Sequence, residues 1–187
     1  MSEKVAKRIA QAKQLASLGN HPEARSVLAK AVAKEPRNLE ARFLLGNECG
    51  ALGLHAEAEA AFREVLRMDP RLVGAYLNIG VAQRSQGRDA EAAESFRNAL
   101  AGMPGNTNVL ANLVAVLNDL DRGAEAAGYA EQWLRLEPAN ALAHYSAAVI
   151  YQGLNDLDRA ESRYLRALGL GGLPPHLRYS ARLNLGV

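Results

Sequence analysis

The residues that most often carry out catalysis or bind metals are few in this chain and far apart in its sequence. The four histidines, His21, His55, His144 and His176, have no His, Cys or carboxylate at the spacing of a metal site. Cys49 is the only cysteine, so neither an intramolecular disulfide nor a thiolate zinc cluster can form. We expect it to be a small buried apolar residue. The sequence therefore predicts neither an enzyme active site nor a cofactor or metal site.

Two short stretches resemble ligand-binding loops but lack residues that such loops need. Residues 155–158, Asn-Asp-Leu-Asp, have the acidic character of a calcium loop without its glycine and its final glutamate. They predict a turn followed by a helix N-cap instead. Residues 169–172, Gly-Leu-Gly-Gly, follow no predicted strand and precede no Gly-Lys-Ser/Thr, which excludes a phosphate-binding loop.

Helical hairpins must position whatever binding residues the chain has, and residues 73–106 show the hairpin most clearly. Gly87 follows a stretch of helical periodicity and predicts the left-handed end of a first helix. Asp89 then predicts the N-cap of a second helix, and Pro104 predicts its end. The apolar stripe of the second helix consists of Ala92, Phe96, Ala99 and Leu100.

A period of 34 residues relates this hairpin to the rest of the chain without an insertion, over residues 5–38, 39–72, 73–106, 107–140 and 141–174. The turn column contains residues that tolerate a left-handed backbone, namely Gly19, Gly53, Gly87, Asp121 and Asn155. One column of the second helix is always alanine, which allows close helix packing, at Ala24, Ala58, Ala92, Ala126 and Ala160. The repeat ends with proline at Pro36, Pro70, Pro104 and Pro138.

This pattern resembles the tetratricopeptide repeat (TPR) family, over about 170 of the 187 residues. The third repeat carries the family's motif residues, which are Tyr76, Ile79, Gly80, Ala92, Phe96, Ala99 and Pro104. The resemblance implies an all-α, right-handed superhelical solenoid of antiparallel helix pairs, with first helices lining a concave face. Residues 1–187 would form a single domain of five repeats and a partial or capping helix over residues 175–187.

The fourth repeat departs from this pattern within its apolar core. Ala130 stands where Phe62, Phe96 and Tyr164 stand in other repeats, and Trp133 takes an alanine column one helical turn later. Val114 replaces the glycine of repeats two and three. We interpret the change as a volume-conserving exchange and expect Trp133 to be a core residue.

The resemblance places apolar and amide side chains of the first helices on the concave face. An Asn amide has both a donor and an acceptor, so it can pair with the backbone of an extended peptide. The predicted peptide-binding residues are Phe43, Asn47, Leu77, Asn78, Val81, Asn108, Ala111, Asn112, Tyr145 and Val149. The predicted function is a protein-interaction scaffold that binds an extended peptide segment of a protein partner, and Asn184 extends the Asn series into the partial repeat.

The carboxyl-terminal segment suggests two alternatives. Leu183, Leu185 and Val187 lie on a first helix without a second helix to cover it, which predicts a self-association site and a homo-oligomer. A chain ending there is also consistent with a fragment, and the protein would then be the substrate-recruiting arm of a larger enzyme such as a glycosyltransferase.

Charge and hydropathy exclude several partners. The formal net charge is only +2, and the arginines of the turns lack interleaved aromatic residues, so nucleic-acid binding is not expected. No apolar run reaches the length of a membrane span, and the amino-terminal 19 residues resemble an amphipathic helix more than a signal peptide. A cytoplasmic location is expected.

Overall fold

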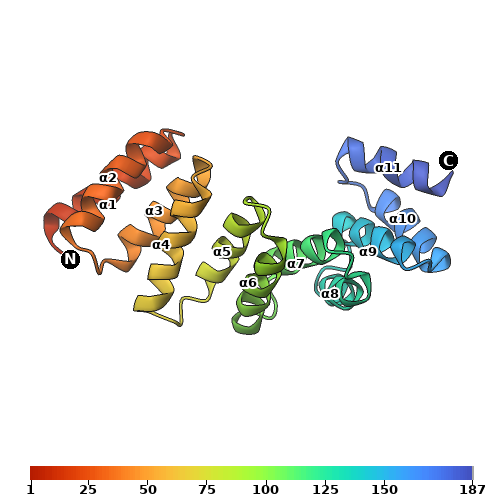
Figure 1. Cartoon of the computed structure of the whole chain (residues 1–187). Coiled ribbons are helices and arrows are strands. Elements are labelled where there is room, and N and C mark those ends of the chain that lie inside the picture. The colour runs from red at the N-terminus through yellow and green to blue at the C-terminus, as the bar shows by residue number, and fades with distance from the viewer. Residues whose placement is uncertain (187) are drawn as a thin grey trace. The chain divides into compact units, whose positions relative to one another are not determined.

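The structure is a computed structural model that describes residues 1–186, and that part of the chain contains helices and no strand (Figure 1). The helices are α1 (Glu3–Ser17), α2 (His21–Lys34), α3 (Leu39–Ala51), α4 (His55–Met68), α5 (Gly74–Arg84), α6 (Asp89–Gly102), α7 (Thr107–Asp119), α8 (Gly123–Leu136), α9 (Ala141–Gly153), α10 (Leu157–Leu170) and α11 (Pro175–Leu185).

The chain divides into two compact units, of which unit 1 contains Met1–Met103 and unit 2 contains the residues from Pro104 onward. Unit 1 comprises α1 to α6, and unit 2 comprises α7 to α11. That residues 1–187 form a single domain stays a prediction.

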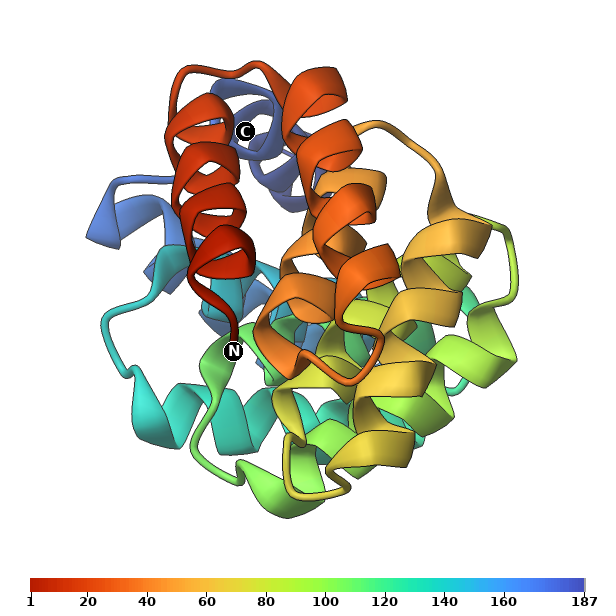
Figure 2. The same ribbon diagram turned by 90° about the vertical axis from the view of Figure 1, so that its left-hand side faces the viewer.

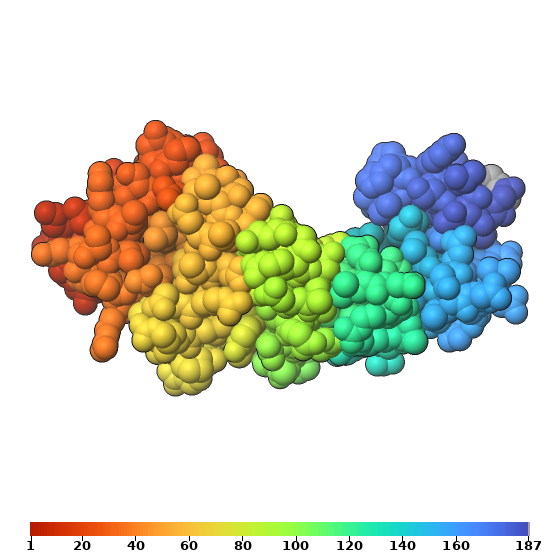
Figure 3. Space-filling view, in the orientation of Figure 1, coloured from red at the N-terminus to blue at the C-terminus, as the bar shows by residue number. Residues whose placement is uncertain are grey.

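Within each unit, consecutive helices pack as antiparallel pairs and each pair packs on the next. In unit 1, α1 pairs with α2, α3 with α4 and α5 with α6, while α2 contacts α3 and α4 contacts α5. Figure 2 shows α1 and α2 side by side. In unit 2, α7 pairs with α8 and α9 with α10, α8 contacts α9, and α11 contacts α10. Figure 3 shows the outer surface in the same orientation, where α11 lies next to α10. These contacts confirm the predicted all-α stack of helix pairs.

The turns between paired helices confirm the predicted left-handed column. Gly19, Gly53 and Gly87 have φ angles of 75°, 73° and 73°. Asp121 and Asn155 take the same backbone conformation, with φ angles of 57° and 59°. A residue in this conformation ends one helix and reverses the chain, and Asp and Asn tolerate it better than other side chains do.

The helix N-termini differ in part from the prediction. Asp89 is the first residue of α6 and provides no side-chain cap, so the predicted N-cap is wrong. Its carboxylate still lies in the first turn, where negative charge is favourable. Asparagines cap several first helices instead: Asn38, Asn106 and Asn140 accept from the amides of Ala41, Val109 and Ala143 at 3.0, 3.1 and 3.0 Å. Asp156 caps α10 as predicted, accepting from the Arg159 amide at 3.2 Å.

The core of each hairpin depends on small residues opposite large ones. All five residues of the alanine column are at most 3% exposed. A Cβ added at Gly46 would lie 2.8 Å from Phe62 Cζ, and one at Gly80 would lie 2.5 Å from Phe96 Cε1. The glycine and the phenylalanine of a repeat are therefore matched in volume.

The fourth repeat reverses this arrangement. Val114 and Ala130 are each 1% exposed, so this repeat buries a branched side chain in the glycine column of α7 and an alanine in the aromatic column of α8. Trp133 is 3% exposed, and its Nε1 donates to Glu137 Oε2 at 3.0 Å. The prediction that Trp133 is a core residue is confirmed, and its polar atom has a partner, as a buried indole requires.

Candidate peptide-binding surface

The predicted binding residues lie on first helices, α3 and α5 in unit 1 and α7 and α9 in unit 2. We call the surface that these residues form within each unit the first-helix face of that unit. In unit 1, Phe43 is half-buried, and its ring packs edge-on against Phe62 with centroids 5.3 Å apart. Leu77 is half-buried, and Val81 is 43% exposed although it is apolar. Phe43 thus contributes to the core as well as to the surface.

The amides of unit 1 are available for a ligand. Asn78 is half-buried on α5, and no side-chain hydrogen bond of Asn78 is present within residues 1–186. Asn47 on α3 is exposed and likewise forms none in that range. Because the side-chain amide of Asn78 is half-buried, water can form only some of its hydrogen bonds. A bound peptide could form the others.

In unit 2 the predicted amides are partly used by the helix itself. Asn112 Nδ2 donates to the backbone oxygen of Asn108 at 2.8 Å, one turn earlier on α7. Such a bond within the helix competes with ligand binding, because it occupies one of the amide's donors. Asn108 is exposed and Ala111 is half-buried. Asn112 therefore presents fewer free donors than Asn78 does.

A pocket of about 150 Å³ lies between α7 and α9. It brings together the predicted residues Tyr145 and Val149, whereas Asn108, Ala111 and Asn112 do not line it. The Tyr145 ring packs against Tyr164 with centroids 5.8 Å apart, which holds one wall of the pocket in place. The pocket is lined by Val114, Ala115, Asn118, Asp119, Tyr145, Ser146, Val149 and Ile150.

Six of these eight lining residues are absent from the predicted set. Asn118 and Asp119 follow Ala115 by three and four positions, so helical spacing alone places them on the same side of α7. Val114 and Ile150 are 1% and 2% exposed and appear in the sequence as ordinary core positions. Nothing in the spacing of Val114 and Ile150 indicates that they also line a pocket.

Two polar residues near the predicted groove have partners within the chain. Lys13 Nζ lies 2.6 Å from Glu40 Oε1, an exposed pair between α1 and α3. Asn184 Nδ2 donates to Tyr164 Oη at 2.7 Å, and that hydroxyl donates to Gln152 Oε1 at 2.7 Å. Asn184 thus helps to fix α11 on α10, so it does not continue the Asn series as expected.

The predicted self-association residues lie on α11, which packs on α10 (Figure 3). Leu183 is 67% exposed, and Leu157 at the start of α10 is 60% exposed. Leu185 is half-buried and lines a pocket of about 250 Å³ together with Leu157 and Tyr164. Val187 lies outside the described residues.

Two further reactive side chains, Cys49 and His21, are engaged in packing or in a polar contact. Cys49 is 2% exposed, and burial raises the pKa of its thiol, which disfavours the thiolate. His21 Nδ1 lies 2.8 Å from Glu48 Oε2. Within residues 1–186, no group of three or more His, Cys, Asp and Glu side chains could hold a metal ion. No helix of that part of the chain is long and apolar enough to cross a membrane.

Stacked antiparallel helix pairs with left-handed turns define a helical-repeat protein of the kind that serves in protein interactions. The sequence model of the tetratricopeptide repeat family matches residues 9–71 and 47–107, which together are more than half of the chain. The chain belongs to the tetratricopeptide repeat family, and the predicted resemblance is confirmed. A comparison with curated proteins finds no match.

Solved structures show the same fold. A crystal structure of MamA protein is 20% identical with a TM-score of 0.85, and the alignment covers 91% of this chain and 93% of that one. YrrB, described as a TPR protein with an unusual peptide-binding site, is 19% identical with a TM-score of 0.81, covering 94% and 90%. TTC0263, a thermophilic TPR protein of Thermus thermophilus, is 22% identical with a TM-score of 0.65, covering 98% and 100%.

Proposed function

We propose that this protein is an interaction scaffold that holds an extended segment of a protein partner on its first-helix faces. The observation that carries the proposal is the pocket between α7 and α9, whose walls include the apolar residues Tyr145 and Val149. A pocket of this size accommodates one apolar side chain, since an apolar cavity of about 150 Å³ can bind benzene. The pocket would therefore anchor a single aliphatic or aromatic residue of the guest.

Amides would fix the backbone of the guest in each unit. In unit 1, the side-chain amide of Asn78 is free within the described residues. In unit 2, the side-chain oxygen Oδ1 of Asn112 can accept a hydrogen bond from a peptide N–H. The partly exposed apolar residues Leu77 and Val81 would contact guest side chains. The description of YrrB as having a peptide-binding site supports this assignment for the shared fold.

The test begins with the selection of binding peptides from a random library on the intact protein. Affinities of the selected peptides are then measured by fluorescence anisotropy. We expect Asn78→Ala and Asn112→Ala each to weaken binding by roughly three- to ten-fold, the value of one hydrogen bond. Val149→Asp should weaken it more, because a carboxylate would replace an apolar side chain of the pocket wall.

Asn98→Ala is the matched control, because Asn98 is an exposed asparagine on the second helix α6. It should leave the affinity unchanged, and circular dichroism should show equal helicity for all variants. Peptides that bind the Asn78, Asn112 and Val149 variants as tightly as the wild type would rule out the first-helix faces as the binding surface.

A second candidate function is self-association through the end of unit 2, favoured by the exposed leucines Leu157 and Leu183. Light scattering over a concentration series should then show a mass that rises with concentration, and Leu183→Ser should reduce the rise. Leu18→Ser is the control, since Leu18 is 74% exposed in the turn after α1. A constant monomer mass over the whole series would exclude this function.

A further inference from the structure

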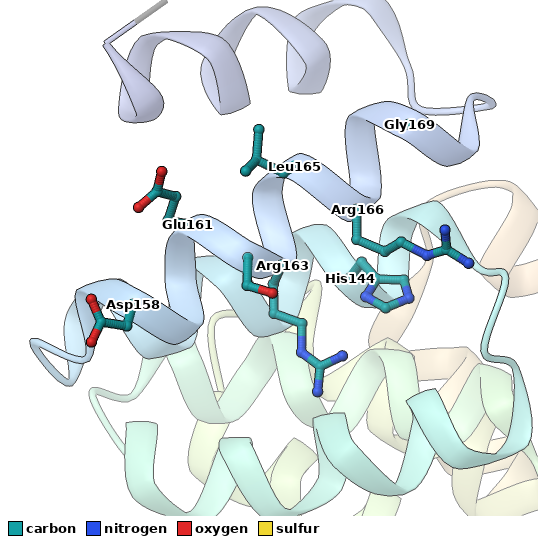
Figure 4. Close-up of a pocket in the computed structure, with 8 residues that line it drawn as sticks. His144, Asp158, Glu161, Arg163, Leu165, Arg166 and Gly169 are labelled. Atoms are coloured by element: carbon teal, nitrogen blue, oxygen red, sulfur yellow. The ribbon is translucent and has the colours of Figure 1, made fainter.

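The second helix of the fifth repeat bears a large, polar cavity that the proposed function does not use. The cavity has a volume of about 730 Å³ and opens along α10 (Figure 4). One lining residue, His144, belongs to α9, and the others belong to α10. They are Asp158, Glu161, Ser162, Arg163, Leu165, Arg166 and Gly169. The site is wide open to solvent and carries many charged side chains, so it does not suit an apolar small molecule.

The carboxyl-terminal half of the cavity carries cations. Arg163 Nη2 donates to Glu131 Oε1 at 2.9 Å, which holds this guanidinium in place and offsets its charge. Arg166 is exposed and forms no ion pair within residues 1–186. In Figure 4 both arginines extend from the same side of α10 as the His144 ring. This end of the cavity therefore has one arginine whose charge no neighbouring carboxylate offsets.

His144 adds an unused polar atom at the same end. Its side chain is buried, with 5% of the residue exposed, and Nε2 lies 3.0 Å from the carbonyl oxygen of Pro138. A carbonyl oxygen can only accept, so Nε2 carries the proton and Nδ1 is an acceptor in the neutral ring. Nδ1 is buried and has no hydrogen-bond partner in the described part of the chain.

The amino-terminal half of the cavity is acidic. Asp158 and Glu161 are exposed, and neither forms an ion pair within the described residues. Asp158 and Arg166 are eight residues apart on one helix, which corresponds to about 12 Å along its axis. Leu165, one turn beyond Glu161, is 55% exposed. Acidic, apolar and basic groups thus follow one another along α10.

We propose that this face of α10 is a second binding site, for an extended segment of a protein with a basic and an acidic residue four positions apart. An extended chain advances about 3.3 Å per residue, so four residues span the separation of the two charged ends. The basic residue would lie at Asp158 and Glu161, and the acidic residue at Arg166. An apolar residue between them would cover Leu165. This site lies on a second helix and does not depend on the first-helix faces.

The test uses the whole chain labelled with nitrogen-15 and a synthetic peptide, acetyl-Lys-Ala-Leu-Ala-Glu-amide. Nuclear magnetic resonance suits this titration, because ion pairs at an exposed site contribute little affinity. We expect amide shifts in α10 and around His144. The same peptide with glutamine in place of lysine and glutamate should bind at least roughly three-fold more weakly. Equal affinity for both peptides, or shifts confined to the first helices, would overturn the proposal.

Charge reversal tests the cationic end. Arg166→Glu should weaken binding of the Lys/Glu peptide by roughly three- to ten-fold. The Arg166→Glu variant should also bind a peptide with lysine at both ends more tightly than the wild-type protein does. Arg135→Glu is the matched control, because Arg135 is exposed on α8 and does not line the cavity. Equal effects of both substitutions would show a general charge effect and no site on α10.

The outcome is independent of the proposed function. Asn78→Ala and Asn112→Ala should leave the titration of α10 unchanged, and Arg166→Glu should leave first-helix binding unchanged. Loss of both activities in either variant would contradict the existence of two separate sites.

Discussion

At the scale of single residues, Gly80 and Phe96 show how the repeat limits its own substitutions. The Phe96 ring occupies the space where a Cβ of residue 80 would stand, and both residues are fully or almost fully buried. Interiors are packed too densely to absorb an extra methyl without moving neighbours. The fourth repeat instead has Val114 in the glycine column and Ala130 in the aromatic column, and both are 1% exposed.

Gly80→Ala should therefore destabilise the protein by about 1–3 kcal/mol, the usual cost of overpacking. Urea unfolding followed by circular dichroism measures the change. Gly50→Ala is the control, since Gly50 also lies inside a helix but a Cβ there meets nothing within 4 Å. It should be neutral or stabilising, because alanine is the better helix former. Equal destabilisation by both substitutions would contradict the steric explanation.

Glu59 is a buried carboxylate whose ionised form the fold stabilises. It is 7% exposed and accepts from Arg63 Nη2 at 2.8 Å, from Gln86 Nε2 at 3.2 Å and from Arg88. Burial alone would raise the pKa of Glu59, but the hydrogen bonds from Arg63 and Arg88 outweigh burial and lower it. A pKa that is lower in the folded than in the unfolded state stabilises the fold at neutral pH.

That contribution should be lost as the pH falls through the folded-state pKa of Glu59. Glu59→Gln should cost about 1–3 kcal/mol at pH 7, because the charged hydrogen bonds are weakened. Its free energy of unfolding should then fall less than that of the wild type between about pH 5 and pH 3. Glu94→Gln, at a 67% exposed side chain paired with Arg97, is the control. Parallel pH profiles for the wild type and Glu59→Gln would refute this role.

At the scale of the element, the turn between paired helices sets where each hairpin reverses. Every such turn has one residue in the left-handed conformation, glycine in the first three repeats and Asp121 or Asn155 in the last two. This conformation costs a residue with a Cβ roughly 1–2 kcal/mol, less for Asn and Asp, whose short side chains bond locally. The turn is thus determined by backbone preference more than by side-chain contacts.

Asn155→Ala should destabilise the α9–α10 hairpin by about 1 kcal/mol, and Asn155→Gly should be neutral or slightly stabilising. Thermal unfolding of both variants measures the difference. Ser162→Ala, at an exposed position inside α10 of the same hairpin, tests whether loss of any polar side chain there has the same effect. Equal stability of Asn155→Ala and Asn155→Gly would show that the left-handed conformation of residue 155 does not limit the stability of the hairpin.

At the scale of the whole molecule, the chain divides into two compact units, and unit 2 contains the only tryptophan of the sequence. Trp133 is 3% exposed in unit 2, so its fluorescence reports the unfolding of that unit. Repeat proteins gain stability from each repeat and from its nearest neighbours, so a local change affects distant repeats little.

We therefore expect Gly80→Ala, a substitution in unit 1, to shift the urea midpoint of circular dichroism more than that of Trp133 fluorescence. Trp133 emission and far-ultraviolet circular dichroism, recorded on the same samples, give both midpoints. Ala130→Gly in unit 2 is the converse control, because it should move the fluorescence midpoint more. Equal shifts of both midpoints for Gly80→Ala would show that the chain unfolds as one cooperative block.

The fold and the hairpin boundaries could be predicted from the sequence, because they depend on local preferences that recur every 34 residues. Helical periodicity, the left-handed turn column and the terminal prolines each act within a few residues of where they stand. The one wrong cap, Asp89, lies a single position from the true N-cap, within the usual uncertainty of a helix boundary.

The sites could be predicted only in part, because they depend on which side chains of different helices meet. Helical spacing placed Tyr145 and Val149 on one face, but the pocket also needs Val114 and Asn118 of α7. Contacts between helices also pair Asn184 with Tyr164. They leave Nδ1 of His144 without a hydrogen-bond partner among the described residues, in a site that two arginines line. Periodicity determines the face of a helix on which a residue lies, whereas packing between helices determines which groups remain free to bind.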